Sequence, residues 1–130
     1  MPSRSIALTT LVVRDYDEAI AFYRDKVGFA LIEDTPLGGG KRWVVIGPVA
    51  EAGALLLALA DGVLQAARIG DQTGGRVGFF LHTDDFERDY AAMTAKGVKF
   101  IRPPVREPYG VVAVWEDLYG NRWDLLQPRG

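Results

Sequence analysis

The sequence predicts an α+β fold made of two tandem βαβββ modules, at about residues 5–62 and 75–128. The order strand, helix and three strands occurs twice, and the pair Asp15-Tyr16 lies 70 residues before Asp85-Phe86. Four strands with one helix leave one apolar face of a sheet uncovered. We therefore expect one domain over residues 1–130, in which a curved mixed sheet surrounds a shared cavity and the helices lie outside.

The first module begins with a β-branched apolar strand at 6–13. Asp15 can cap a helix whose first turn is acidic, and Gly28 can end it, so we expect a helix over about 15–27. The remaining strands are expected at 29–34, 42–46 and 54–60, with a hairpin turn at the glycines 38–40.

The second module repeats this order. Asp85 and Gly97 bound a helix expected over about 85–96. The expected strands are 77–83, 98–101, 111–115 and 122–126, and the glycine-rich segment 70–75 is interpreted as a surface connection.

Composition limits the possible partners. Fifteen basic and seventeen acidic residues give a net charge of -2, without a basic stretch, so we expect no nucleic acid or membrane partner. The chain has no cysteine, which excludes disulfides and thiolate chemistry. Its N-terminus lacks the apolar core of a signal peptide, and we expect a cytoplasmic protein.

Two motifs carry a resemblance to a known family. The segment Leu11-Val-Val-Arg-Asp-Tyr-Asp-Glu-Ala-Ile-Ala-Phe-Tyr-Arg-Asp-Lys-Val-Gly-Phe29 is similar to the opening of glyoxalase-like proteins, and Trp115-Glu-Asp-Leu-Tyr-Gly-Asn-Arg-Trp-Asp-Leu-Leu126 resembles their closing motif. The chain thus resembles the vicinal-oxygen-chelate superfamily of glyoxalases, bleomycin resistance proteins and dioxygenases. The resemblance implies the same fold and a homodimer, while the family's activities range from isomerases to drug-sequestering proteins.

The same resemblance implies where a divalent metal would be bound. The family's ligand positions fall on Leu8, Gly78 and Asp124, with a fourth near Leu57. Leucine and glycine side chains cannot coordinate a metal, and His82 is the single histidine of the chain. We therefore predict no metal and no cofactor.

Asp124 and His82 are the candidate catalytic or ligand-binding residues. Strand alternation places His82 on one face with Gly78, which suggests a polar group at the cavity mouth, although a bond to the backbone or to a following aspartate is the alternative. Asp124 shares a face with Arg122, so it either binds a ligand or pairs with that arginine.

Two aromatic residues complete the candidate ligand-binding set. Tyr109 follows two prolines in the expected loop 102–110, which would hold it over an opening or leave it in a solvated turn. Trp115 is expected either to contact the ligand or to pack in the core.

The predicted function is binding of a small molecule, which the protein sequesters or transforms without a metal. One alternative is a lyase or dioxygenase of the glyoxalase type whose metal site is completed by a partner chain. A second alternative is a non-catalytic interaction subunit whose cavity is filled by its own side chains.

Overall fold

The chain folds into two compact units. The computed structural model describes residues 2–49 and 53–130, and its units are Met1–Ile69 and Gly70–Gly130. The boundary falls at the start of the glycine-rich connection. Each unit has a strand, a helix and then three strands, so the predicted α+β fold of two βαβββ modules is confirmed.

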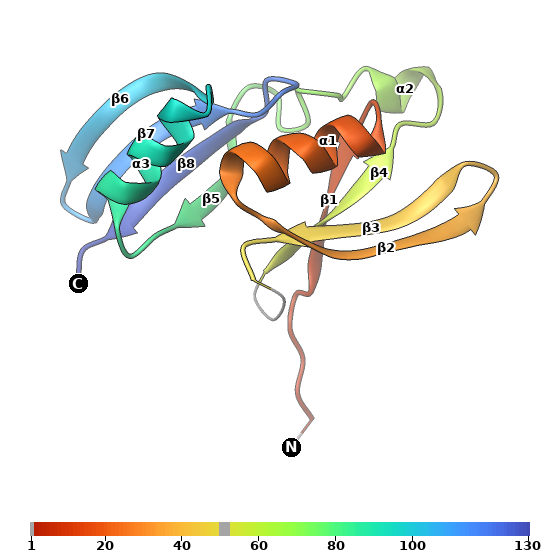
Figure 1. Cartoon of the computed structure of the whole chain (residues 1–130), viewed down its shortest axis with the longest axis horizontal. Coiled ribbons are helices and arrows are strands. Elements are labelled where there is room, and N and C mark those ends of the chain that lie inside the picture. The colour runs from red at the N-terminus through yellow and green to blue at the C-terminus, as the bar shows by residue number, and fades with distance from the viewer. Residues whose placement is uncertain (1, 50–52) are drawn as a thin grey trace. The chain divides into compact units, whose positions relative to one another are not determined.

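The first unit is a four-stranded sheet with one main helix (Figure 1). The strand order is β1-β4-β3-β2, with β1 parallel to β4 and the other neighbours antiparallel. The elements are β1 (Leu8–Val13), α1 (Tyr16–Phe22) with a π-helical turn η1 (Tyr23–Val27), β2 (Ala30–Gly38), β3 (Lys41–Gly47), β4 (Ala54–Leu59) and a short helix α2 (Gly62–Ala66).

The second unit repeats this topology. Its strand order is β5-β8-β7-β6, again with the first and last strands parallel. The elements are β5 (Val77–His82), α3 (Phe86–Ala95), β6 (Lys99–Glu107), β7 (Gly110–Glu116) and β8 (Arg122–Pro128). None of the helices in the described residues is long and apolar enough to cross a membrane.

The two main helices begin and end as the sequence predicts. The Asp15 side chain accepts the backbone N–H of Glu18 at 2.8 Å, and the Asp85 side chain accepts that of Arg88 at 3.1 Å. Gly28 and Gly97 follow the helical segments with a φ of 88°, a left-handed conformation that glycine adopts at little cost.

The helical segments differ by one residue. The interval from Asp15 to Gly28 is one residue longer than that from Asp85 to Gly97. The longer segment ends in the π-helical turn, whereas α3 is α-helical up to Ala95. A π-helical turn accommodates one additional residue within a helix, so both units reach the next strand through the same kind of cap.

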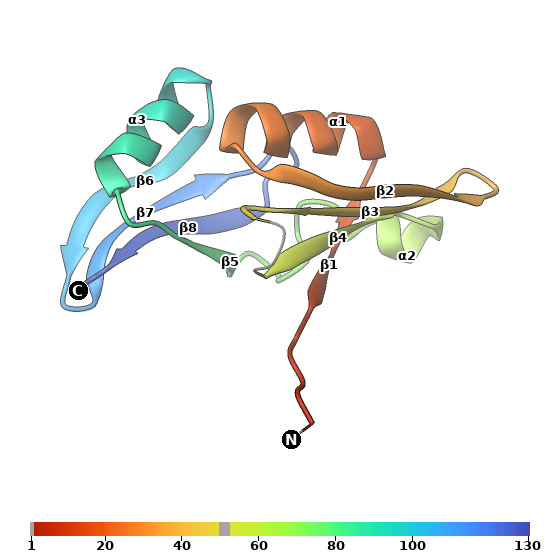
Figure 2. The same ribbon diagram turned by 60° about the horizontal axis from the view of Figure 1, so that its bottom comes forward.

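The core of each unit lies between its helix and one face of its sheet. In the first unit Leu11, Val44 and Leu57 are fully buried on this face, and in the second Trp115 and Leu125 are. Figure 2 shows α1 and α3 each on one face of its own unit's sheet. The opposite face, which no helix of the unit covers, is called the helix-free face below.

Three elements differ from the sequence prediction. The strand expected at 29–34 continues to Gly38. The helix α2 was not predicted, and β6 extends to Glu107 although the sequence indicated a loop from Arg102 onward. Pro103 and Pro104 cannot donate to a sheet ladder, but β6 is an edge strand, where proline is tolerated. The register shifts between Arg102 and Val105 accommodate them.

Candidate functional site

A row of four side chains crosses the helix-free face of the second unit. Arg102 pairs with Val114, Val114 with Asp124, and Asp124 with Phe80, each from the neighbouring strand. Directly paired residues in a sheet point to the same face. Phe80 is 62% exposed, and Val114 is buried. The row therefore presents an aromatic ring and a carboxylate next to each other, with a guanidinium across Val114.

Asp124 is half-buried in an apolar setting. Burial raises the pKa of its carboxyl group above the ordinary value, and the charge of Arg102 opposes that rise. Arg122 does not provide the predicted partner, because its guanidinium donates to the carbonyl of Gly75 at 2.9 Å. Asp124 is thus a half-buried carboxylate on this face, and Arg102 is a basic neighbour that the sequence analysis missed.

Rows on either side of this one define the surroundings of Asp124. His82 pairs with Leu126, which pairs with Val112, so His82 lies on the same face of the sheet as Asp124. His82 is exposed at the end of β5. On the other side Glu116 lies opposite Arg122 on the neighbouring strand. The Glu116 carboxylate lies 3.5 Å from the Lys99 ammonium. The face is therefore apolar around Asp124 and charged at one end.

The prediction for Gly78 was wrong in its detail. A β-bulge shifts the register between Val77 and Phe79, so Gly78 has no direct partner on β8 and strict alternation does not apply to it. A Cβ atom at Gly78 would lie 2.7 Å from Cγ2 of Thr73. The place that a side chain at position 78 would fill is thus occupied by Thr73, in the segment before β5.

The two aromatic candidates lie in different environments. Tyr109 is 55% exposed in the turn between β6 and β7, away from the row of Asp124. Trp115 is fully buried and stacks on Trp123 with ring centroids 4.9 Å apart. It is a core residue on the helix side, and we leave it out of the candidate site.

The first unit has an equivalent row with different chemistry. Glu33 pairs with Val45, Val45 with Leu56, and Leu56 with Thr10. The counterpart of Asp124 is therefore Leu56. Leu56 is next to Leu57, near which the resemblance placed a fourth ligand position, while Leu57 itself is fully buried on the helix side.

The residues near Asp124 do not fit a divalent metal. Its direct neighbours across the sheet are Phe80 and Val114, which have no donor atoms. Within residues 2–49 and 53–130, no three histidine, aspartate or glutamate side chains gather closely enough to hold a metal ion. A single carboxylate does not form the three- or four-donor site that such metals need.

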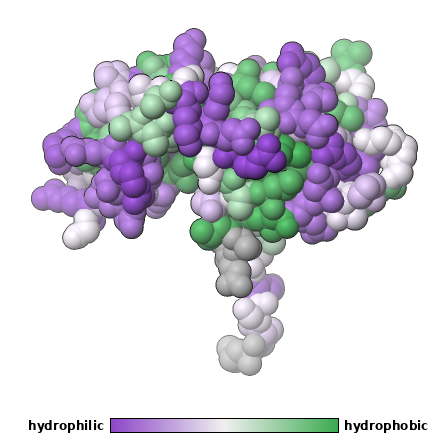
Figure 3. Space-filling model, viewed as in Figure 1, coloured by the Kyte–Doolittle hydropathy of each residue, from purple (hydrophilic) through white to green (hydrophobic). Residues whose placement is uncertain are grey.

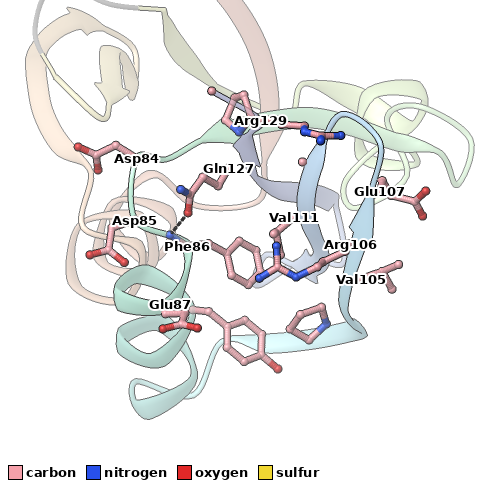
Figure 4. Close-up of a pocket in the computed structure, with 15 residues that line it drawn as sticks. Asp84, Asp85, Phe86, Glu87, Val105, Arg106, Glu107, Val111, Gln127 and Arg129 are labelled. Carbon is pink, nitrogen blue, oxygen red and sulfur yellow. Dashed lines mark hydrogen bonds between the residues drawn. The ribbon is translucent and has the colours of Figure 1, made fainter.

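A hollow lies on the helix side of the second unit, between the start of α3 and the β6–β7 hairpin. It has a volume of about 1010 Å³, and Figure 4 shows Phe86, Arg106 and Val111 around it. The side-chain oxygen of Gln127 accepts the backbone N–H of Phe86 at 2.8 Å across its floor.

In the first unit, an arginine fills the place that corresponds to this hollow. Arg42 donates to Asp34 at 2.7 Å and to Asp17 at 2.9 Å, and its guanidinium lies 5.0 Å from the centre of the Tyr16 ring. These contacts connect the hairpin to α1. The second unit has Val111 at the position equivalent to Arg42, so its hairpin has no such bridge.

Comparison with known proteins identifies similar chains. Residues 5–125 match the family described as the Glyoxalase/Bleomycin resistance protein/Dioxygenase superfamily. An uncharacterized protein of Shewanella frigidimarina is 57% identical over 95% of this chain and 93% of its own length. TnmS3, an antibiotic binding protein from Streptomyces sp. CB03234, is 30% identical with a TM-score of 0.78, over 99% of both chains. UcmS2 is 31% identical with a TM-score of 0.82, over 97% of this chain and 98% of its own.

Proposed function

Because this chain belongs to the glyoxalase/bleomycin resistance protein/dioxygenase superfamily, we propose that it binds and sequesters a small aromatic molecule on the helix-free face of its second unit. The observation that carries the proposal is the row Arg102–Val114–Asp124–Phe80. The likeness to an antibiotic binding protein at 30% identity supports the same kind of activity.

The row has the composition of a small-molecule site. Such sites combine apolar and aromatic surface with a few polar groups that fix orientation. Phe80 provides an exposed ring on which a flat ligand can stack, and Asp124 next to it accepts hydrogen bonds from a ligand hydroxyl or amine. Arg102 can donate to a carbonyl or an acidic group on the same molecule.

Substitution of Asp124 tests the proposal. We expect Asp124→Asn to change the free energy of unfolding by no more than about 1 kcal/mol, because Asp124 forms no ion pair with the described residues and asparagine keeps the shape of the side chain. It should weaken the binding of aromatic antibiotics about tenfold, through loss of a charge-assisted hydrogen bond. Calorimetric titration of a panel of such compounds measures this.

The matched control is Asp71→Asn, an exposed carboxylate of the same unit outside the row. It should leave both binding and stability unchanged. If Asp124→Asn strongly destabilises the protein while binding stays the same, Asp124 has a structural role and the proposal is wrong.

The pKa of Asp124 also predicts a pH dependence. Since burial raises this pKa, the carboxylate becomes protonated at a higher pH than an ordinary aspartate. Binding of a neutral, hydrogen-bond-donating ligand should therefore weaken as the pH falls through that raised value. Binding to Asp124→Asn should not change over the same range, and an identical pH profile for both proteins would contradict the assignment.

We also propose that the protein is a homodimer. Apolar residues (green) gather on the visible surface of the first unit near the N-terminal segment (Figure 3). Among the described residues, Ile6 is 89% and Val49 57% exposed in that unit. Exposed apolar surface of this kind favours self-association. Sedimentation equilibrium should give twice the chain mass, and a stable monomer at micromolar concentration would refute the dimer.

A further inference from the structure

The helix-free face of the first unit carries a cavity of its own. Its volume is about 470 Å³, within the usual range for small-molecule sites. The walls come from the segment before β1, from the middle of β2 and β3, and from the start of β4. The apolar part is formed by Ile6, Ala7, Leu8, Ile32, Val45 and Ala54.

Glu33 is the charged residue among the described residues that line this cavity. One of its oxygens accepts the Thr35 hydroxyl at 3.1 Å, and no basic side chain of the described residues pairs with it. The adjacent Asp34 differs, because it points to the helix side and is paired with Arg42 at 2.7 Å. The cavity thus has a negative charge without a counter-charge of its own.

Trp43 provides an aromatic surface in the same cavity. Val44 is fully buried on the helix side, so strand alternation places Trp43 and Val45 on the helix-free face. The indole is 37% exposed and lines the cavity together with Glu33. An indole face attracts cations more strongly than other aromatic rings do.

From these observations we infer that the cavity of the first unit binds an organic cation, with its apolar part against Trp43 and Val45 and its positive charge next to Glu33. The inference does not depend on the proposed role of Asp124, which lies in the other unit. A neutral molecule of the same shape would keep the apolar contacts but lose the ion pair and the cation–π interaction. An anion would be repelled by Glu33.

Tryptophan fluorescence can report binding at this place. The chain has three tryptophans, and Trp115 and Trp123 are 0% and 4% exposed. A ligand that quenches emission and protects it from iodide must therefore contact Trp43. The probes are phenyltrimethylammonium, its uncharged analogue tert-butylbenzene, and benzoate.

We expect saturable quenching by phenyltrimethylammonium and binding about tenfold weaker for tert-butylbenzene, since the uncharged analogue forms neither the ion pair nor the cation–π interaction. Benzoate should not bind. Glu33→Gln should weaken phenyltrimethylammonium about three- to fivefold, and Glu33→Lys more strongly. Circular dichroism checks that both variants are folded.

Two carboxylates of the second unit serve as controls. Glu107→Gln and Asp124→Asn should leave the binding of phenyltrimethylammonium unchanged, which separates this cavity from the site of the proposed function. Equal affinity for the cation and its uncharged analogue would overturn the inference. No saturable quenching, or no effect of Glu33→Gln, would overturn it as well.

Discussion

At the scale of single residues, the sequence indicated Asp124 as a candidate but not the residues that surround it. Asp124 was found because the closing motif resembles that of a known family. Arg102 and Phe80 were missed because their positions in the row of Asp124 depend on strand register, which is shifted at Gly78 on β5 and on both sides of Arg102 on β6. A bulge depends on pairing between distant segments, which local patterns do not report.

Asp117 is a residue whose buried contacts predict a large effect on stability. One carboxylate oxygen accepts the backbone N–H groups of Tyr119 and Asn121, both at 2.9 Å, and the other accepts the Asn121 side chain at 2.8 Å. Because Asp117→Ala leaves buried donors unpaired, we expect it to lower the free energy of unfolding by about 2–3 kcal/mol. Urea denaturation measures this.

The exposed Asp71 provides the comparison for Asp117. Asp71→Ala should change stability by less than about 0.5 kcal/mol, as most surface substitutions do. Similar losses in the two variants would mean that the hydrogen bonds of Asp117 contribute nothing beyond a surface carboxylate.

At the scale of elements, both main helices and most strand positions followed from local signals. Capping aspartates, periodic apolar residues and terminal glycines are short-range features, and α1 and α3 lie where they indicate. The strand at 98–101 was predicted, but its continuation to Glu107 was missed because Pro103 and Pro104 are typical of loops. Its pairing with β7 decides the outcome, since tertiary contacts override local propensity.

The β6–β7 hairpin predicts a sharp difference between two glycines. Gly110 has a φ of 149°, and a Cβ atom there would collide with the backbone carbonyl of Gln127 on β8. Gly39 has a φ of 63° and open space around it. We expect Gly110→Ala to lower the free energy of unfolding by about 3 kcal/mol and Gly39→Ala by about 1 kcal/mol. Alanine at position 39 introduces backbone strain only, whereas alanine at position 110 also collides with β8.

Chemical denaturation of both variants checks this difference. Equal decreases in the free energy of unfolding would mean that β7 and β8 move apart at Gly110 without losing stability. The collision would then not determine the effect of the substitution.

At the scale of the whole molecule, the family and its fold could be predicted from the sequence, but the ligand could not. Sequence order determines which elements occur, and the repeated order indicates two modules. The chemistry of a site depends on a few side chains that face the same way, such as Glu33 with Trp43. These lie ten residues apart on paired strands, and no local motif connects them.

The donor atoms of the whole chain predict its metal content. One histidine and the apolar neighbours of Asp124 do not form a site with three or four donors. Elemental analysis of purified protein should therefore find no stoichiometric transition metal. Added Zn²⁺, Ni²⁺ or Mn²⁺ should not raise the melting temperature, since a ligand stabilises a protein only by binding its native state.

A content near one metal ion per chain would instead favour a lyase or dioxygenase whose ligands are completed by a partner chain.

The π-helical turn Tyr23–Val27 has a consequence for how this chain tolerates changes in length. The additional residue widens one helical turn, and Gly28 still ends the segment in the conformation that Gly97 has in the second unit. The gain or loss of a residue here is therefore absorbed locally, and the strands that follow keep their faces. An insertion within a paired strand would instead turn every later side chain to the opposite face. The turn is thus a place where the two units differ in length without exchanging the inside and the outside of a sheet.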